Sequence, residues 1–200
     1  MKDPYSSVAP FYSFLVNLVF GSGLREAKLS NLGNRNLGKI LIIGGGDGKD
    51  YKHLKLPMNG DFWEKSEAML ELAKKNLTNS GLNFHLGDFS KSDAKDYEEI
   101  WLHFVLDTLE NDELADFLQT CRSKLSSDGK VYFADFYPPV SRWQKLVHGI
   151  MISFFRVSTG YQRKEVPDYD RFFTKIGFAK AKEKTLKKGW IRSSVLEIKD

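Results

Sequence analysis

Glycines and one acidic residue carry the clearest chemical signal in this chain of 200 residues. Residues 39–48 read Lys-Ile-Leu-Ile-Ile-Gly-Gly-Gly-Asp-Gly, and Glu64 follows the first of these glycines by about twenty positions. Glycine adopts positive φ at low cost and lets the backbone approach a ligand closely. A carboxylate at this spacing can accept hydrogen bonds from both hydroxyl groups of a ribose. The pattern therefore predicts a site for an adenosine cofactor, with an ordinary tight turn and a solvated Glu64 as the alternative.

The flanking residues predict the elements that would position this turn. The apolar run 40–43 is β-branched and too short for a helix, which favours a buried parallel strand that ends at Gly44. Ligands bind at the carboxyl ends of the strands in α/β sheets. We expect a helix over 51–56 and then a second strand that ends near 62–63, which would bring Glu64 to the same edge as the turn.

Two common adenosine cofactors fit the turn poorly. A dinucleotide fingerprint requires Gly-x-Gly-x-x-Gly, and Lys49 occupies its last position here. A Walker loop requires Ser or Thr after Gly-Lys, whereas Asp50 stands there and would repel phosphate. Both NAD and ATP are therefore disfavoured.

Two further segments give the chain a resemblance to a known family. Residues 64–70, Glu-Lys-Ser-Glu-Ala-Met-Leu, resemble the acid-x-Ser-x-x-Met-Leu segment of class I S-adenosylmethionine-dependent methyltransferases, and residues 87–89 resemble their Gly-Asp-apolar segment. The resemblance implies that Glu64 takes the ribose hydroxyls, Asp88 accepts from the adenine amino group and Phe89 covers the ring. The residues that it implies for binding S-adenosylmethionine are Gly44, Gly45, Gly46, Asp47, Gly48, Glu64, Lys65, Met69, Asp88, Phe89, Leu102 and His103.

The remaining elements extend the resemblance to the whole fold. Further strands are expected at 82–86, 100–105 and 130–134, with a core helix near 114–125, a helix over 169–176 and a hairpin over 178–198 that turns at 187–189. The family then implies a Rossmann-like three-layer α/β sandwich, whose seven-stranded, mostly parallel sheet ends in an antiparallel hairpin. We expect a single domain with four parts: an amino-terminal helical cap (1–37), the cofactor core (38–137), an acceptor-covering insertion (138–166) and the terminal helix and hairpin (167–200).

Two departures from the family pattern keep other functions open. Ile42 stands where the family usually has an acid that helps to hold the methionine amino group, and Lys65 stands where an apolar residue commonly packs on adenine. The turn is also close to that of spermidine synthases, so aminopropyl transfer from decarboxylated S-adenosylmethionine is one alternative. A non-catalytic protein that binds the cofactor is another.

Two aromatic-rich segments outside the core are candidates for contact with the methyl acceptor. The segment 5–20 resembles the amino-terminal helices of ubiquinone and menaquinone biosynthesis methyltransferases, and 143–157 occupies the insertion after the fifth strand. Tyr12, Trp143 and Phe154 are the candidate acceptor contacts, which would suit a small apolar acceptor such as a quinol, a phenol or a lipid. The alternative is that both segments simply pack on the sheet as helices.

Methyl transfer by in-line displacement has no obligatory base, because orientation and the exclusion of water can suffice. If a base acts, His103 is the first candidate, since it lies near the end of the fourth strand and is expected to titrate near neutrality. A packed structural histidine is the alternative. Asp107, Asp135 and His148 are weaker candidates, and Asp135 is expected to cap a turn.

Length and composition agree with a single compact domain: 42% of the residues are hydrophobic, which can supply a full core, and the net charge is +4. The chain has one cysteine, Cys121, at a core position of the helix expected after the fourth strand. A single cysteine excludes an internal disulfide and favours a reducing cytoplasmic setting. No secretory signal, transmembrane segment or metal site is expected. No nucleic-acid partner is expected either, because the lysines after 178 alternate as on a solvated edge strand. Peripheral membrane contact is a lesser alternative, since the apolar stripe carries few basic residues. Nothing indicates the oligomeric state.

Overall fold

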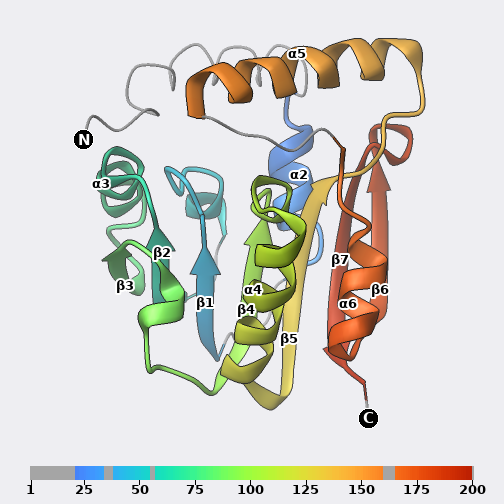
Figure 1. The fold of residues 1–200 in the computed structure, drawn as a ribbon. Coiled ribbons are helices and arrows are strands. Elements are labelled where there is room, and N and C mark those ends of the chain that lie inside the picture. Colours follow the sequence, from blue (N-terminus) through green and yellow to red (C-terminus); the bar gives the residue numbers. More distant parts are fainter. Residues whose placement is uncertain (1–20, 34–37, 55–56, 160–164, 200) are drawn as a thin grey trace.

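A seven-stranded sheet forms the centre of the molecule (Figure 1). The computed structural model describes residues 21–33, 38–54, 57–159 and 165–199, with the backbone alone for 153–159. The strands lie in the order β3-β2-β1-β4-β5-β7-β6. Their bounds are β1 (Lys39–Ile43), β2 (Asn59–Glu64), β3 (Gly81–Leu86), β4 (Tyr97–His103), β5 (Leu125–Phe136), β6 (Phe178–Leu186) and β7 (Ile191–Ile198). The first five pair in parallel, whereas β7 is antiparallel to β5 and β6, which confirms the expected sheet.

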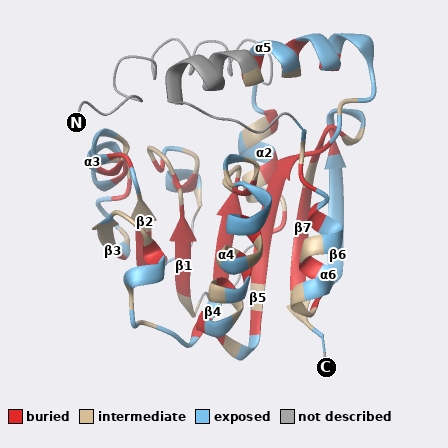
Figure 2. Ribbon diagram, in the orientation of Figure 1, coloured by how far each residue is buried: buried red, intermediate tan, exposed pale blue. Residues whose placement is uncertain are grey.

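Alternate residues of β1 supply two separate cores, one on each face of the sheet. Ile40 and Ile42 pack in a cluster that includes buried residues of α3 (Glu67–Asn76), and Leu41 and Ile43 pack in a cluster that includes those of α4 (Asn111–Lys124) and α6 (Tyr169–Ile176). This follows from the two-residue period of a strand. Figure 2 shows the resulting pattern, in which β1, β4, β5 and β7 are largely buried, whereas the edge strand β6 and the outer sides of the helices are exposed.

Short 3₁₀ turns replace helices in two of the strand connections. The expected helix over 51–56 was wrong: among the described residues between β1 and β2 the chain forms only η1 (Tyr51–His53), and Leu54 already has an extended backbone with ψ 125°. Between β3 and β4 it forms only η2 (Phe89–Lys91). The connections after β2 and β4 contain the full helices α3 and α4; α4 and α6 lie on one face of the sheet, and α3 lies on the other (Figure 1).

A polar cluster occupies the sheet beside η2, where helical cover is thin. The Asp61 carboxylate on β2 accepts hydrogen bonds from the Tyr97 hydroxyl, at 2.7 Å, and pairs with His85 Nε2, also at 2.7 Å. Burial alone would raise the pKa of Asp61, but the hydrogen bonds from Tyr97 and His85 outweigh it and lower the pKa below its usual value. The His85 ring in turn stacks on Trp63, with ring centroids 4.5 Å apart.

Helix α5 (Arg142–Thr159) lies across the carboxyl ends of the parallel strands (Figure 1). Its Val147 and Met151 pack in one cluster with Ala27 of α2 (Gly23–Leu29) and with residues at the end of β5. No helix in the described part of the chain is long and apolar enough to cross a membrane. The glycine turn follows the carboxyl end of β1, so α5 and this turn lie at the same edge of the sheet (Figure 1).

Candidate cofactor site

The turn after β1 combines a left-handed backbone, which glycine adopts without strain, with open space. Gly44, Gly46 and Gly48 all have positive φ, between 62° and 67°. A Cβ atom at Gly44 would lie 2.7 Å from the Val105 side chain, whereas one at Gly46 would have no atom within 4 Å. The turn therefore needs glycine for its backbone at each position, and at Gly46 it leaves room for a ligand to approach.

Glu64 is held in place by two backbone N–H groups. Gly46 N–H donates to its Oε2 at 3.0 Å, and Ser66 N–H donates to its Oε1 at 2.9 Å. Each carboxylate oxygen can accept a further hydrogen bond. The structure thus brings the glycine turn and the acid together, with a fixed orientation that the sequence did not reveal because backbone donors leave no residue signature.

The turn is also tied to the end of α3. Asn76 Nδ2 donates to the Asp47 carbonyl oxygen at 2.8 Å, and Lys49 Nζ lies 3.6 Å from the Asp47 carboxylate. Asn76 was missed at the level of the sequence, because nothing local links it to a turn 29 residues away. The contact fixes the last residue of α3 against the turn.

Asp88 and Lys65 form an ion pair at the carboxyl ends of β2 and β3. Lys65 Nζ lies 3.7 Å from Asp88 Oδ2, and Ser90 N–H donates to Asp88 Oδ1 at 2.9 Å. Burial opposes ionisation, but the Ser90 hydrogen bonds and the Lys65 charge outweigh it and lower the pKa of Asp88. The Lys65 side chain is 71% exposed, so its ammonium group remains in water.

Three other predicted cofactor contacts lie near this pair or in the core. Met69 is half-buried in the first turn of α3, where its N–H donates to Ser66 Oγ at 3.3 Å. Phe89 is buried and packs edge-on against Phe117, with ring centroids 4.9 Å apart. Leu102 has no exposed surface, so its side chain serves the core on the α4 side of the sheet.

The position of Ile42 carries no carboxylate and is closed to solvent. Ile42 has no exposed surface and packs in one core cluster with Phe62. A Cβ atom at Gly45 would lie 2.5 Å from the Phe62 ring, so the turn rests directly on this core. The part of the turn next to Ile42 therefore offers apolar contact and backbone groups rather than a charge.

His103 is buried and hydrogen-bonded within the protein. Its Nδ1 lies 2.9 Å from the Tyr51 hydroxyl, and the residue is 3% exposed. Burial, with the nearby positive charge of Lys28, lowers the pKa of His103 to about 3. The expected titration near neutrality was therefore wrong, since the imidazole has too little contact with water to hold a proton.

The weaker base candidates also have structural partners. Asp135 is completely buried and caps a turn, as expected: its carboxylate accepts from the N–H groups of Leu106 and Asp107 at the start of η3 (Leu106–Thr108). Burial and the neighbouring Asp107 charge raise the pKa of Asp135 well above its usual value. His148 packs edge-on against Trp190, with ring centroids 6.3 Å apart, and burial lowers its pKa.

The predicted acceptor contacts are described only in part. Tyr12 lies outside the described residues, and the side chain of Phe154 on α5 does as well. Trp143 lies in the first turn of α5 with 64% of its surface exposed, whereas Val147, one turn further along, is buried. The structure therefore does not place Trp143 with the glycine turn.

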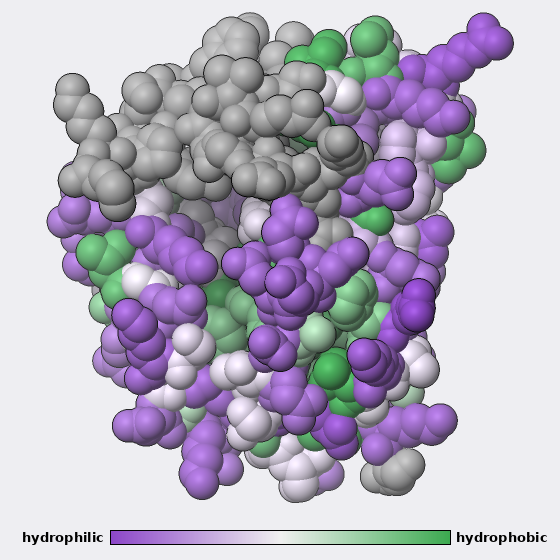
Figure 3. Space-filling model, viewed as in Figure 1, coloured by the Kyte–Doolittle hydropathy of each residue, from purple (hydrophilic) through white to green (hydrophobic). Residues whose placement is uncertain are grey.

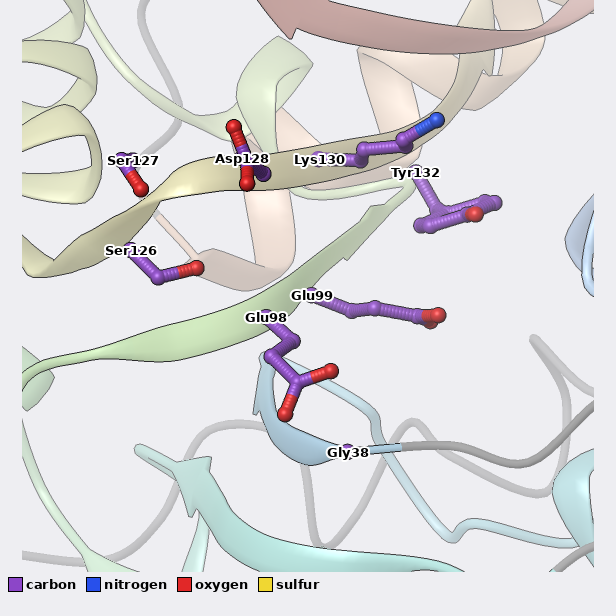
Figure 4. Close-up of a pocket in the computed structure, with 8 residues that line it drawn as sticks. All are labelled: Gly38, Glu98, Glu99, Ser126, Ser127, Asp128, Lys130 and Tyr132. Atoms are coloured by element: carbon purple, nitrogen blue, oxygen red, sulfur yellow. The ribbon is translucent and has the colours of Figure 1, made fainter.

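A separate hollow lies at the opposite edge of the sheet (Figure 4). It is lined by Gly38, Glu98, Glu99, Ser126, Ser127, Asp128, Lys130 and Tyr132. The Glu99 carboxylate accepts from Trp101 Nε1 at 2.8 Å. No group of three His, Cys, Asp or Glu side chains among the described residues is arranged to hold a metal ion.

Comparison with known proteins identifies the fold. The sequence matches no protein-family model and no curated protein sequence. Among solved structures, mitomycin 7-O-methyltransferase MmcR superposes with a TM-score of 0.71 at 16% identity, over 98% of this chain and 59% of that one. The putative methyltransferase in a complex with the Haloferax volcanii Trm112 activator gives 0.72 at 13% identity, over 95% and 96%.

A third structure, the DhpI–SAH complex, gives a TM-score of 0.70 at 15% identity, over 98% of this chain and 93% of DhpI. This chain therefore spans about three fifths of MmcR and nearly all of DhpI. The strand order, the glycine turn and these superpositions agree. The chain has the fold of the class I S-adenosylmethionine-dependent methyltransferases.

Proposed function

We propose that this chain is an S-adenosylmethionine-dependent methyltransferase that acts on a small, apolar acceptor of the quinol, phenol or lipid type. The observation that carries the proposal is the pairing of the glycine turn with Glu64. Gly46 combines positive φ, open space and an N–H group that orients the Glu64 carboxylate. That combination suits a ribose whose diol binds the carboxylate while the rest of the cofactor crosses the turn.

The residues of the site fit S-adenosylmethionine at its nucleoside end. Glu64 would accept from the two ribose hydroxyls, because both of its oxygens are oriented and each can accept another hydrogen bond. Asp88 would accept from the adenine amino group, and its lowered pKa keeps it ionised. The stem of Lys65 would cover one face of adenine while its ammonium group stays paired with Asp88.

Bound S-adenosylmethionine would supply an electrophilic methyl group on a sulfonium centre. The protein would contribute orientation and the exclusion of water, since a positioned acceptor needs little further help. His103 would not take a proton near neutrality, because burial holds it neutral and Tyr51 occupies its Nδ1. Its role would be to fix η1 beneath the site.

A second candidate function is cofactor binding without methyl transfer. The buried Ile42 favours it, because the amino group of the cofactor would find no carboxylate at that position. Turnover separates the two functions: transfer of a labelled methyl group to any of a panel of quinols, phenols, lipids and amines would establish catalysis. Tight binding with no transfer would leave only the binding role.

The experiment that tests the cofactor is calorimetric titration of the chain with S-adenosylmethionine, its decarboxylated analogue and NAD. We expect S-adenosylmethionine to bind best and Glu64→Ala to weaken it by about tenfold or more, since hydrogen bonds to a charged group contribute about 1.5–3 kcal/mol. Glu67→Ala is the matched control, because Glu67 is an exposed acid three residues further along the chain.

The other outcomes assign different functions or none. Preference for the decarboxylated analogue would indicate aminopropyl transfer. Failure to bind any of the three ligands would refute the cofactor site. A cytoplasmic location belongs to the same proposal and rests on Cys121, which is free and buried in the core.

A further inference from the structure

Helix α5 presents apolar side chains to solvent as well as to the core. Trp143, Leu146 and Ile150 are 64%, 57% and 49% exposed, and we call these three side chains the outer face of α5. Their spacing places them on one side of the helix. Val147 and Met151 lie on the adjoining side of the helix and are buried, so the apolar stripe continues from the core onto the surface. A contiguous group of exposed large apolar side chains often marks a site of interaction, so the outer face is a candidate contact surface.

The body of the protein holds this helix firmly. Ser141 Oγ accepts from Gln144 N–H at 3.1 Å, and Gln144 Oε1 accepts in return from Ser141 N–H at 3.0 Å. Gln144 Nε2 also donates to the Lys187 carbonyl oxygen at 2.8 Å, and Gln144 is 7% exposed. The first turn of α5 is therefore fixed to the β6–β7 turn, and this contact holds the outer face of α5 towards solvent.

Positive charge surrounds the outer face. Arg142 and Lys145 are exposed on the same helix, and Lys187 and Lys188 are exposed in the turn that Gln144 contacts. Over the whole segment 136–164 the sequence contains five basic residues and no Asp or Glu; the basic residues are Arg142, Lys145, Arg156, Arg163 and Lys164. Figure 3 shows hydrophobic residues at the edge of the molecule where α5 lies, with hydrophilic residues beside them.

We propose that the outer face of α5 binds the surface of a lipid bilayer that contains anionic phospholipids. A helix with Trp and Leu on one side and Lys and Arg beside them is suited to the interface, where the apolar groups enter the headgroup region and the cations meet lipid phosphates. The helix does not qualify as a membrane span, so it would lie in the plane of the interface.

A second copy of the chain fits the outer face less well than a membrane. A two-fold contact through α5 would bring the basic residues of two copies together, and the segment 136–164 contains no Asp or Glu to offset their repulsion. Three side chains also provide much less area than the roughly 800 Å² per partner of a stable interface. An anionic bilayer attracts the basic residues rather than repelling them, and its binding does not require a large complementary protein surface.

The orientation that this binding imposes has a consequence for the site. The glycine turn and α5 lie at the same edge of the sheet (Figure 1). A membrane bound to the outer face would therefore be on the cofactor side of the molecule. The inference itself does not depend on the proposed function, because it concerns binding to lipid and needs neither cofactor nor acceptor.

Co-sedimentation of the full chain with lipid vesicles tests the proposal. One set of vesicles is phosphatidylcholine alone, and the other contains phosphatidylglycerol as well. We expect binding to the anionic vesicles, weakened about tenfold or more by L146E/I150E and by R142A/K145A, and weakened by salt. Leu72→Glu is the matched control, because Leu72 is 45% exposed on α3, and it should bind as the parent chain does.

Tryptophan fluorescence supplies an independent signal. Trp143 is the most exposed of the four tryptophans: Trp63 is half-buried, and Trp101 and Trp190 are 0% and 3% exposed. A blue shift on addition of anionic vesicles, lost in Trp143→Phe, would support insertion of the outer face. Circular dichroism of each variant would show that the fold is retained.

Three results would overturn the proposal. The first is no binding to anionic vesicles by a folded chain. The second is binding that L146E/I150E leaves unchanged. The third is a dimer in analytical ultracentrifugation that L146E/I150E dissociates in a chain that ignores vesicles, which would assign the outer face to a second copy.

Discussion

Replacing His103 by asparagine tests how strongly the fold excludes a proton from this site. The Asn side chain is uncharged at every pH, and its amide can form a hydrogen bond with the Tyr51 hydroxyl in place of the one at His103 Nδ1. The substitution therefore removes the titration while keeping the hydrogen bond. Some loss of packing is expected, but that loss does not depend on pH.

The size of the effect follows from the pKa. Burial, with a smaller contribution from Lys28, lowers the pKa of His103 from 6.5 to about 3 in the folded chain. The unfolded chain then binds a proton below 6.5 that the folded chain refuses, so stability is complete above that pH and is lost as the pH falls towards 3. Between about pH 7.5 and about pH 5 the free energy of unfolding should fall by about 2 kcal/mol on this account.

Urea denaturation of the parent chain and of His103→Asn at these two pH values is the assay. The fall in stability should be smaller by about 2 kcal/mol in His103→Asn, and other titrating groups cancel in this difference. His53→Asn is the control, because His53 is exposed in η1 and its loss should leave the pH dependence of the parent. An equal fall in the parent and in His103→Asn would refute the argument that His103 stays neutral.

Two further substitutions test the turn and the polar cluster. Gly46→Ala should cost about 1 kcal/mol of stability because of its positive φ, and it should weaken S-adenosylmethionine binding, whereas Gly149→Ala should add about 1 kcal/mol within α5. Thermal melts would measure the stability of both variants, and titration would measure their binding of S-adenosylmethionine. Equal effects at the two glycines would contradict the assignment of the cost to positive φ at Gly46. Tyr97→Phe should cost about 1–3 kcal/mol in urea, because the buried Asp61 loses its 2.7 Å donor. It should also reduce the acid-induced loss of stability, since the pKa of Asp61 would rise toward its usual value; a change under about 0.5 kcal/mol would rule this out.

Local patterns predicted the parts of the fold that have local causes. Four apolar residues before a glycine run predicted β1, and Gly177, with φ 85°, ends α6 where a C-cap was expected. The hairpin of β6 and β7 turns at Lys187–Gly189, as its turn residues indicated. Each of these signals lies within a few residues of the feature that it predicts.

The expected helix over 51–56 failed because a contact distant in sequence decides that segment. The spacing of Tyr51 and Leu54 is compatible with a helix, but the Tyr51 hydroxyl bonds to His103 on β4 and the chain is extended by Leu54. Pro57 follows and also favours extended backbone. The same contact explains the error over His103, whose burial depends on a residue 52 positions away.

The two connections without helices lower the free energy needed to open the part of the sheet formed by β1, β2 and β3, which we call the cofactor half. β3 is an edge strand that pairs only with β2, and η2 is the short segment that leads from it to β4. This half has α3 packed on one face, and the described residues place no helix of its own on the other, so its local opening requires less free energy than opening of the half that holds α4 and α6. A ligand that bridges the glycine turn, Glu64 and Asp88 would join β1, β2 and β3 at their ends and raise that local free energy by RT ln(1 + [L]/Kd). The cofactor would thus act as a structural element of the sheet, and the rigidity of this region would rise and fall with its concentration.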